Sequence, residues 1–195
     1  SAASDVYKRQ GQNVRPTRLL EAGFRFAKPT IEDFFEGTDH AVVDRLDLHR
    51  YMGTWYEIAR FDHRFERGLS EVTATYTLMP DGTVRVENRG CKHKKPYDVC
   101  KTAEGRAKIP DPSQPGKLKV SFFLSFYSDY YVLELDQDEY NYALIGSSSD
   151  KYLWILSRAP ILPEEIKKKL LDAATRRGYD VKKLIWVEQR EKKIM

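Results

Sequence analysis

The sequence of 195 residues predicts an all-β protein, an eight-stranded antiparallel up-and-down barrel with one C-terminal α-helix packed on its outside. Apolar and polar residues alternate from residue 53 to residue 157, which is typical of strands with one buried face. Short turns join these strands, whereas parallel strands need crossovers of about a dozen residues or more. Closing the sheet into a barrel removes its two edges and leaves room inside for one small ligand.

The first 40 residues lie outside this pattern. Asp5 to Gln10 reads like the translation of a sequencing adapter, so we interpret residues 1–10 as an assembly artefact and expect the natural start, with any signal peptide or lipid anchor, to be missing. Residues 11–40 have no apolar partner of their own. They are either an N-terminal extension or the stump of a truncated upstream domain, because residues 18–33 resemble the closing segment of nucleotide-sugar-epimerase-like proteins.

The strands follow one another from residue 54 onward. Pro80-Asp81-Gly82 is a hairpin turn signal between two alternating segments, and residues 110–116 form a second turn rich in Pro, Ser and Gly. The eight expected strands are residues 54–61, 72–78, 83–87, 103–109, 117–122, 130–135, 142–147 and 151–157.

A single helix is expected after the strands. Pro163 stands at its first position, acidic residues occupy its first turn, and Gly178 follows its basic last turn. Ile166, Leu170 and Ala173 form an apolar stripe, which we expect to pack on the outside of the barrel. A short strand over residues 184–188 is expected to pair at an edge.

Composition excludes two classes of protein. Hydrophobic residues make up 41% of the chain and aromatic residues 12%, but no run of about 18 apolar residues occurs, so a membrane-spanning helix is excluded. The net charge is +4, and the surplus lies in Pro163 to Met195, which holds ten basic and six acidic side chains. This excess is too small and too local for a nucleic-acid-binding surface.

The segment Gly53-Thr54-Trp55 resembles the glycine-x-tryptophan signature that opens the first strand of lipocalins. The similarity extends over residues 43–189, including residues 61–69, 117–123, 152–158 and 185–187, and is greatest to the bacterial outer-membrane lipocalins. The resemblance implies that residues 41–195 form a lipocalin domain with the barrel described above.

Two further lipocalin motifs are present in part. Asp138 and Tyr142 match the second motif, whereas Gln137 and Glu139 depart from it, which leaves the geometry of that turn open. Arg158 matches the third motif, and the resemblance implies that its guanidinium lies across the indole of Trp55. Such a cation–π contact contributes about 0.5–2 kcal/mol, so we assign Trp55 and Arg158 a structural role.

The family pattern also implies which side chains line the barrel interior. In one interpretation these side chains simply fill the barrel; in the other, small residues among them leave a cavity for a ligand. The polar members are candidates for orienting a polar head group or for bonding to water. The predicted ligand-binding residues are Ala74, Tyr76, Val86, Asn88, Val120, Phe122, Tyr130, Val132, Ala143, Ile145, Tyr152 and Trp154.

An apolar lining of this kind favours an elongated apolar ligand with one polar end. A chain of about 14 to 16 carbons gains on the order of 12 kcal/mol on burial, against association costs of about 4–15 kcal/mol. The arithmetic fits lysophospholipids and fatty acids at micromolar or tighter affinity, while two-chain lipids need a wider barrel. We expect no cofactor and no metal.

Four residues outside this set call for partners or roles. Strand alternation places Glu57 inside the barrel with Trp55 and Ala59, where a carboxylate needs a tyrosine, an arginine or a ligand beside it. Cys91 and Cys100 form either a disulfide or two free thiols, and His93 is interpreted as part of a solvated face.

The leading functional hypothesis is a noncatalytic carrier that stores or transports lipids for bacterial membrane maintenance. The resemblance implies a place in the cell envelope, at the outer membrane or in the periplasm, with the cytoplasm as the alternative if residues 11–40 belong to a cytosolic domain. Membrane association through a missing N-terminal lipid anchor and a homodimer are further expectations. The alternatives are a lipocalin-type enzyme acting through Cys91 and a membrane- or partner-binding module using the basic C-terminal region.

Overall fold

The computed structural model describes residues 37–93, 97–123 and 126–190. The chain divides into two compact units, residues 1–39 and residues 40–195. The predictions for residues 1–10, and for all but the last four residues of the 11–40 segment, lie outside the described residues. None of the helices that the structure describes is both long enough and apolar enough to cross a bilayer.

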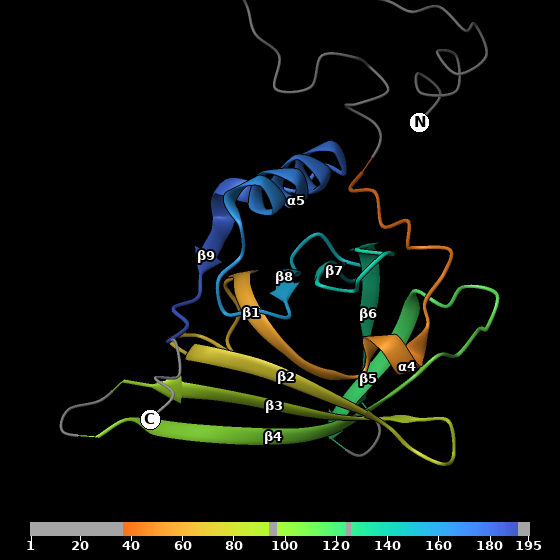
Figure 1. Ribbon diagram of the computed structural model, residues 1–195, viewed down its shortest axis with the longest axis horizontal. Coiled ribbons are helices and arrows are strands. Elements are labelled where there is room, and N and C mark those ends of the chain that lie inside the picture. Colours follow the sequence, from red (N-terminus) through yellow and green to blue (C-terminus); the bar gives the residue numbers. More distant parts are fainter. Residues whose placement is uncertain (1–36, 94–96, 124–125, 191–195) are drawn as a thin grey trace, which may run out of the picture. The chain divides into compact units, whose positions relative to one another are not determined.

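Eight antiparallel strands form a closed barrel, as predicted (Figure 1). Each strand pairs with the next along the chain, and pairing of the first strand with both the second and the eighth closes the sheet. The strands are β1 Gly53–Phe61, β2 Ser70–Leu78, β3 Val84–Lys92, β4 Val99–Lys108, β5 Lys117–Phe123, β6 Phe126–Leu135, β7 Tyr142–Gly146 and β8 Leu153–Ser157.

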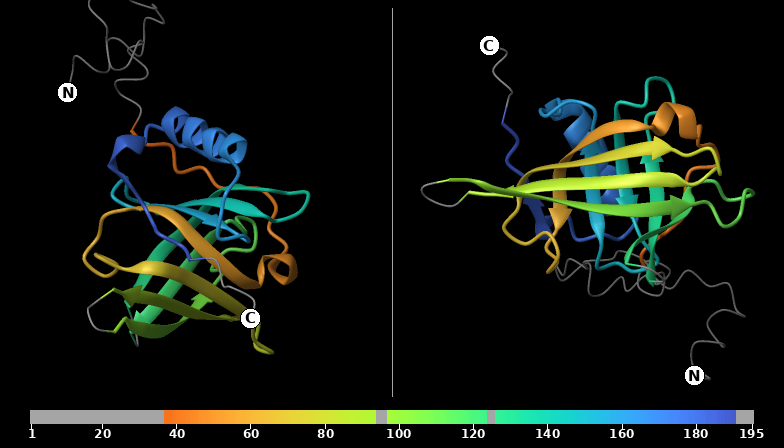
Figure 2. Two further views of the ribbon diagram at one scale, coloured as in Figure 1. Left: turned by 60° about the vertical axis from the view of Figure 1, so that its left-hand side comes forward. Right: turned by 90° about the horizontal axis from the view of Figure 1, so that it is seen from below.

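The β3–β4 hairpin is longer than the alternation predicts. Its pairing continues from Val84 opposite Ala107 to Lys92 opposite Val99. Polar and glycine residues between positions 88 and 92 hide the periodicity, so the sequence shows only the first half of β3 and the second half of β4. The extended hairpin projects beyond the neighbouring strands (Figure 2).

A short helix that the sequence analysis did not predict, α4 Leu48–Tyr51, precedes β1. The Asp47 carboxylate caps it by accepting hydrogen bonds from the main-chain N–H groups of His49 and Arg50. Helix α4 brings the buried Tyr51 ring to 5.0 Å from the Trp55 ring, measured between centroids. The helix therefore belongs to the end of the barrel at which β1 begins.

The C-terminal helix, α5 Glu164–Arg176, packs outside the barrel as predicted. Its buried residues Leu170, Ala173 and Ala174 share one apolar cluster with outward-facing residues of β7 and β8. A 3-10 helix, η1 Val181–Lys183, leads into β9 Leu184–Trp186, which pairs with β1 at its outer edge. Figure 2 shows α5 lying across one side of the barrel.

A β-bulge in β1 changes which of its side chains face inward. Glu57 pairs with Leu156 and Ala59 with Ile155, so one residue of β1 is extra at this point. A bulge of this kind reverses the alternation of side chains beyond it. The expectation that Ala59 faces inward is therefore wrong, because Ala59 packs in the outer cluster beneath α5. Arg60 lies inside the barrel instead.

Candidate functional site

The end of the barrel at which β1 begins is closed by Trp55 and Arg158. Trp55 is fully buried, its indole N–H donates to the Tyr51 carbonyl at 2.9 Å, and the Arg158 guanidinium lies 3.9 Å from the ring centroid. Arg158 also donates hydrogen bonds of 2.8–3.3 Å to the main-chain carbonyls of Arg50, Tyr51, Met52, Thr54 and Tyr140.

Gly53 lies directly beside this guanidinium. Its φ is +94°, and a Cβ at this position would lie 3.3 Å from Nη1 of Arg158. A side chain here would be strained and would crowd the arginine, which explains the glycine of the first motif in physical terms. Closure of this end leaves access to the interior through the other end, which we call the mouth.

The turn of the second motif is held to the N-terminal segment through main-chain carbonyls and through the Gln137 side chain, which donates to the Arg45 carbonyl at 3.1 Å. Arg50 donates to the carbonyls of Gln137 and Asp138, so these contacts do not depend on which side chains occupy the turn. Tyr142 points outward, where its hydroxyl accepts a hydrogen bond of 2.7 Å from Lys169 of α5. The departures at Gln137 and Glu139 therefore leave the turn tied to α4.

The structure brings the predicted lining residues together on the inner face. Tyr76, Val86, Val120, Val132, Ala143 and Ile145 are buried in one cluster, against which Ala74, Phe122, Tyr130 and Trp154 pack while only partly buried. Asn88 pairs with Ala74 across β2 and β3 and shares its face. Tyr152 immediately precedes β8 at the mouth end of the barrel, and its ring is stacked on that of Trp154 at an interplanar angle of 9°.

Three tyrosine hydroxyls meet deep in the barrel. The Tyr130 hydroxyl lies 2.6 Å from the hydroxyl of Tyr51 and 3.0 Å from that of Tyr76. Burial, with the neighbouring tyrosines, raises the pKa of Tyr130 well above its ordinary value, so all three rings stay neutral. Tyr51 was missed by the sequence analysis because it precedes the first strand.

A buried ion pair lies between this cluster and the mouth. Glu57 is 4% exposed and Arg60 2% exposed, and Nη1 of Arg60 donates to the Glu57 carboxylate at 2.6 Å. Arg60 is thus the partner that the burial of Glu57 required. Burial, together with the charge of Glu66, raises the pKa of Glu57 to about 8 in spite of the adjacent guanidinium.

The loop from Asp62 to Leu69 folds over the mouth. Nη2 of Arg60 donates to the carbonyls of Glu66 at 2.6 Å and Leu69 at 3.2 Å. The Glu66 carboxylate accepts a hydrogen bond of 3.1 Å from the Trp154 indole and lies 2.7 Å from Nε2 of His63. Burial alone would raise the pKa of Glu66, but the contacts with His63, Trp154 and Arg60 hold it below its ordinary value.

Other residues of this loop face outward. Phe65 is 67% exposed beneath the Arg64 guanidinium, and Arg67 pairs with Asp62 at 2.7 Å. Arg60, His63 and Glu66 were not predicted as interior groups, because the bulge in β1 is invisible in the alternation. The available signal was Glu57, a buried carboxylate in need of a cation.

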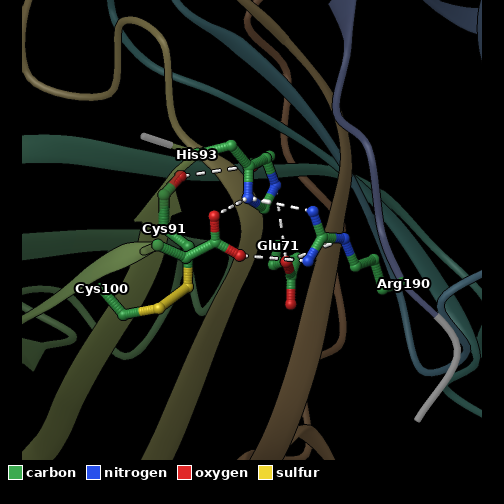
Figure 3. The surroundings of a disulfide bond; sticks show 7 residues. Glu71, Cys91, His93, Cys100 and Arg190 are labelled. Atoms are coloured by element: carbon green, nitrogen blue, oxygen red, sulfur yellow. Dashed lines mark hydrogen bonds and ion pairs between the residues drawn. A yellow bond between two sulfur atoms is a disulfide. The ribbon is translucent and has the colours of Figure 1, made fainter. Parts of the chain in front are cut away.

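Cys91 and Cys100 are joined by a disulfide at directly opposed positions of β3 and β4 (Figure 3). By strand alternation Cys91 lies on the opposite face of β3 from Val86 and Asn88, outside the interior. The enzymatic alternative needs a free thiol at Cys91, and in this structure the sulfur is bonded to Cys100.

Charged residues from three segments meet beside the disulfide (Figure 3). His93 lies 2.8 Å from the Asp98 carboxylate and 3.5 Å from that of Glu71, and Arg190 lies 3.1 Å from Asp98. His93 is exposed, as expected for a residue of a solvated face, and it pairs with these carboxylates at the surface. The imidazole and the two carboxylates bring potential metal ligands within 4.8 Å of one another, but the Arg190 guanidinium already supplies positive charge to the same carboxylates.

A closed antiparallel barrel with a sealed base and an apolar, aromatic interior defines a class of proteins that hold small ligands inside the barrel. Comparison with known proteins gives the family: the profile of the Lipocalin-like domain matches residues 46–189. The chain belongs to the lipocalin family. A second profile, a domain of unknown function (DUF1731), matches residues 9–37.

Relatives and solved structures agree with this assignment. The chain is 50% identical to the outer membrane lipoprotein Blc of Escherichia coli (strain K12) over 148 residues, which cover 76% of this chain and 82% of that protein. It is 46% identical to the outer membrane lipoprotein Blc of Vibrio cholerae over 147 residues, 75% and 85% of the two chains. The fold is similar to that of insecticyanin from Manduca sexta, with a TM-score of 0.63 at 24% identity, covering 80% and 87% of the chains.

Proposed function

We propose that the protein is a noncatalytic carrier that binds lipids with a single hydrocarbon chain, lysophospholipids or fatty acids, inside the barrel. Family membership implies binding of a lipid or another small ligand. The observation that carries the finer proposal is the state of the lining: Ala74, Phe122, Tyr130 and Trp154 pack in the interior cluster yet keep accessible surface. Accessible surface on inward-facing side chains is consistent with a barrel that its own side chains do not completely fill.

The arrangement of polar groups matches a ligand with one polar end. Apolar residues line the middle of the barrel, whereas Arg60, Trp154 and Tyr152 lie toward the mouth. A hydrocarbon tail would therefore contact the apolar lining while the head group remains near the loop of residues 62–69. Each methylene buried there contributes about 0.8 kcal/mol, so chain length sets most of the affinity.

We place this carrier in the bacterial cell envelope, where it stores or transports lipids during membrane maintenance. The support is the likeness to bacterial relatives that are named outer membrane lipoproteins. An N-terminal lipid anchor and a homodimer belong to the same proposal.

Lipid that co-purifies with the protein tests the proposal directly. The full chain, purified without detergent, is extracted and the extract analysed by mass spectrometry, and the delipidated protein is then titrated with lysophosphatidylethanolamine. We expect single-chain lipids in the extract and saturable binding in the titration. A protein that carries no lipid and refuses the added lysophospholipid would contradict the proposal.

A matched pair of variants on β2 locates the binding site. Ala74→Trp places a large ring in the interior, whereas Thr77→Trp adds the same ring to the exposed outer face of the same strand. We expect Ala74→Trp to weaken lysophospholipid binding at least tenfold and Thr77→Trp to leave it unchanged. Equal effects of the two variants would place the ligand outside the barrel.

A further inference from the structure

One loop residue at the mouth, Glu66, contacts two residues of the barrel wall through different atoms, and a neighbour on its own loop. Glu66 receives the Trp154 indole N–H at 3.1 Å, lies 2.7 Å from Nε2 of His63, and belongs to the residue whose carbonyl accepts from Arg60 at 2.6 Å. Trp154 of β8 and Arg60 of β1 are paired neighbours on adjacent strands, so both belong to the barrel wall. Glu66, by contrast, stands on a loop.

The arginine in this group is buried without using all of its donors. Arg60 is 2% exposed, and its Nε has no hydrogen-bond partner among the residues that the structure describes. Burying a guanidinium is costly unless anionic oxygens surround it. Arg60 contacts one carboxylate directly, that of Glu57, and two main-chain carbonyls of the loop.

We propose that Glu66 occupies the place of a ligand's anionic head group, and that a carboxylate or phosphate exchanges with it for contact with Arg60 and Trp154. The inference rests on the proposed function and deepens it by naming the head-group class. When the loop moves away, the guanidinium loses the Glu66 and Leu69 carbonyls and the nearby negative charge together. An anionic head group replaces both, whereas an alcohol head group cannot supply the charge.

The neighbouring Glu57 neutralises Arg60 less completely than an exposed carboxylate would. Burial raises the pKa of its carboxyl above the ordinary value, so Glu57 loses its proton less readily and leaves part of the positive charge of Arg60 for another anion. The negative charge of Glu66 is one cause of that elevated pKa, and an anionic head group in its place would act in the same direction.

A purely structural latch makes a different prediction from head-group exchange. If Arg60 and Glu66 only hold the loop closed, substitutions there change the affinity of charged and neutral ligands alike. If the head group takes the place of Glu66, substitutions change the affinity of anionic ligands and spare neutral ones. Two ligands with the same tail and different heads therefore separate the two explanations.

The test titrates the delipidated full chain with myristate and with 1-tetradecanol at pH 7 by calorimetry. We expect the wild type to prefer myristate by about tenfold or more, since hydrogen bonds to charged groups are about twice as strong as neutral ones. Arg60→Met should weaken myristate binding by about 10- to 100-fold and leave 1-tetradecanol within about threefold. Arg64→Met, on the same loop but at the surface, should change neither.

Glu66→Gln provides the opposite perturbation and does not remove a buried cation. The amide retains an acceptor for Trp154 but no charge, so the closed loop competes less with an anion. We expect myristate to bind about 3- to 10-fold more tightly and 1-tetradecanol to be unaffected. If circular dichroism shows that Arg60→Met does not fold, Glu66→Gln alone tests the proposal.

Each outcome decides the inference. Equal losses for both ligands in Arg60→Met, or no gain for myristate in Glu66→Gln, would overturn it. If 1-tetradecanol binds the wild type as well as myristate does, the inference fails while the proposed function stands. If neither ligand binds, both fail. A second pair, myristoyl lysophosphatidic acid and the neutral monomyristoylglycerol, is titrated in the same way. If the anionic ligand is preferred more strongly in this pair than in the myristate and 1-tetradecanol pair, the site favours phosphate; if less strongly, it favours carboxylate.

Discussion

Replacing Arg158 by methionine removes the group that seals the base of the barrel. The side chain donates five hydrogen bonds to main-chain carbonyls and covers the Trp55 ring at 3.9 Å. Two of the five accepting sites are exposed, which leaves three partly buried bonds. At about 1 kcal/mol for each of these and about 0.5–1 kcal/mol for the cation–π contact, the free energy of unfolding should fall by about 3–4 kcal/mol.

Urea denaturation followed by circular dichroism measures this loss, with the disulfide kept oxidised in every variant. For a domain of this size the loss corresponds to a fall in Tm of about 10 °C. Arg158→Lys keeps the charge but cannot form the same fork of hydrogen bonds, so it should lose about half as much. Arg89→Met, at an exposed position of β3, serves as the control. A loss below about 1 kcal/mol, or one equal to that of the control, would refute the structural role of Arg158.

Glu57 should make the protein less stable as the pH rises from about 5 to about 8, because its pKa is raised from 4.5 to about 8 and the folded state holds a proton that the unfolded chain releases. Between pH 5 and pH 9 the urea midpoint should fall less in Glu57→Gln than in the wild type, measured at pH 5, 7 and 9. Equal falls in the two proteins would contradict this. Leu170→Ala, at the centre of the buried stripe of α5, should cost about 2–4 kcal/mol by the same assay, against no measurable cost for the exposed Lys168→Ala. Serine at both cysteines should lower the free energy of unfolding by about 2–3 kcal/mol, and unchanged thermal melting would show that the bond does not constrain the unfolded chain.

The sequence predicts the barrel well because its determinants are periodic. Alternation on each strand and short turns between strands require an antiparallel meander, and the helix signals from Pro163 to Gly178 agree with one another. The family signature adds the Trp55–Arg158 contact. The strands and the helix depend on residue types at regular spacing, which a single sequence displays, whereas the contact is inferred from the family signature.

The mouth is not predictable in this way. One extra residue between Glu57 and Ala59 turns Arg60 into the barrel, and a bulge leaves no mark in the residue types of the strand. Helix α4 is a single short turn, below the length at which periodicity can be recognised. The polar groups that decide ligand choice therefore lie where the pattern is interrupted.

The C-terminal segment fastens the seam at which β1 and β2 meet. The side-chain amide of Gln189 donates to the carbonyls of both Glu57 and Val72, and the Glu188 carbonyl accepts from the Glu71 N–H. These residues are the last part of the described chain to be synthesised, whereas the strands they join are among the first. During translation β1 and β2 can pair with each other early, whereas these added contacts across their seam form only after nearly the whole domain has been made.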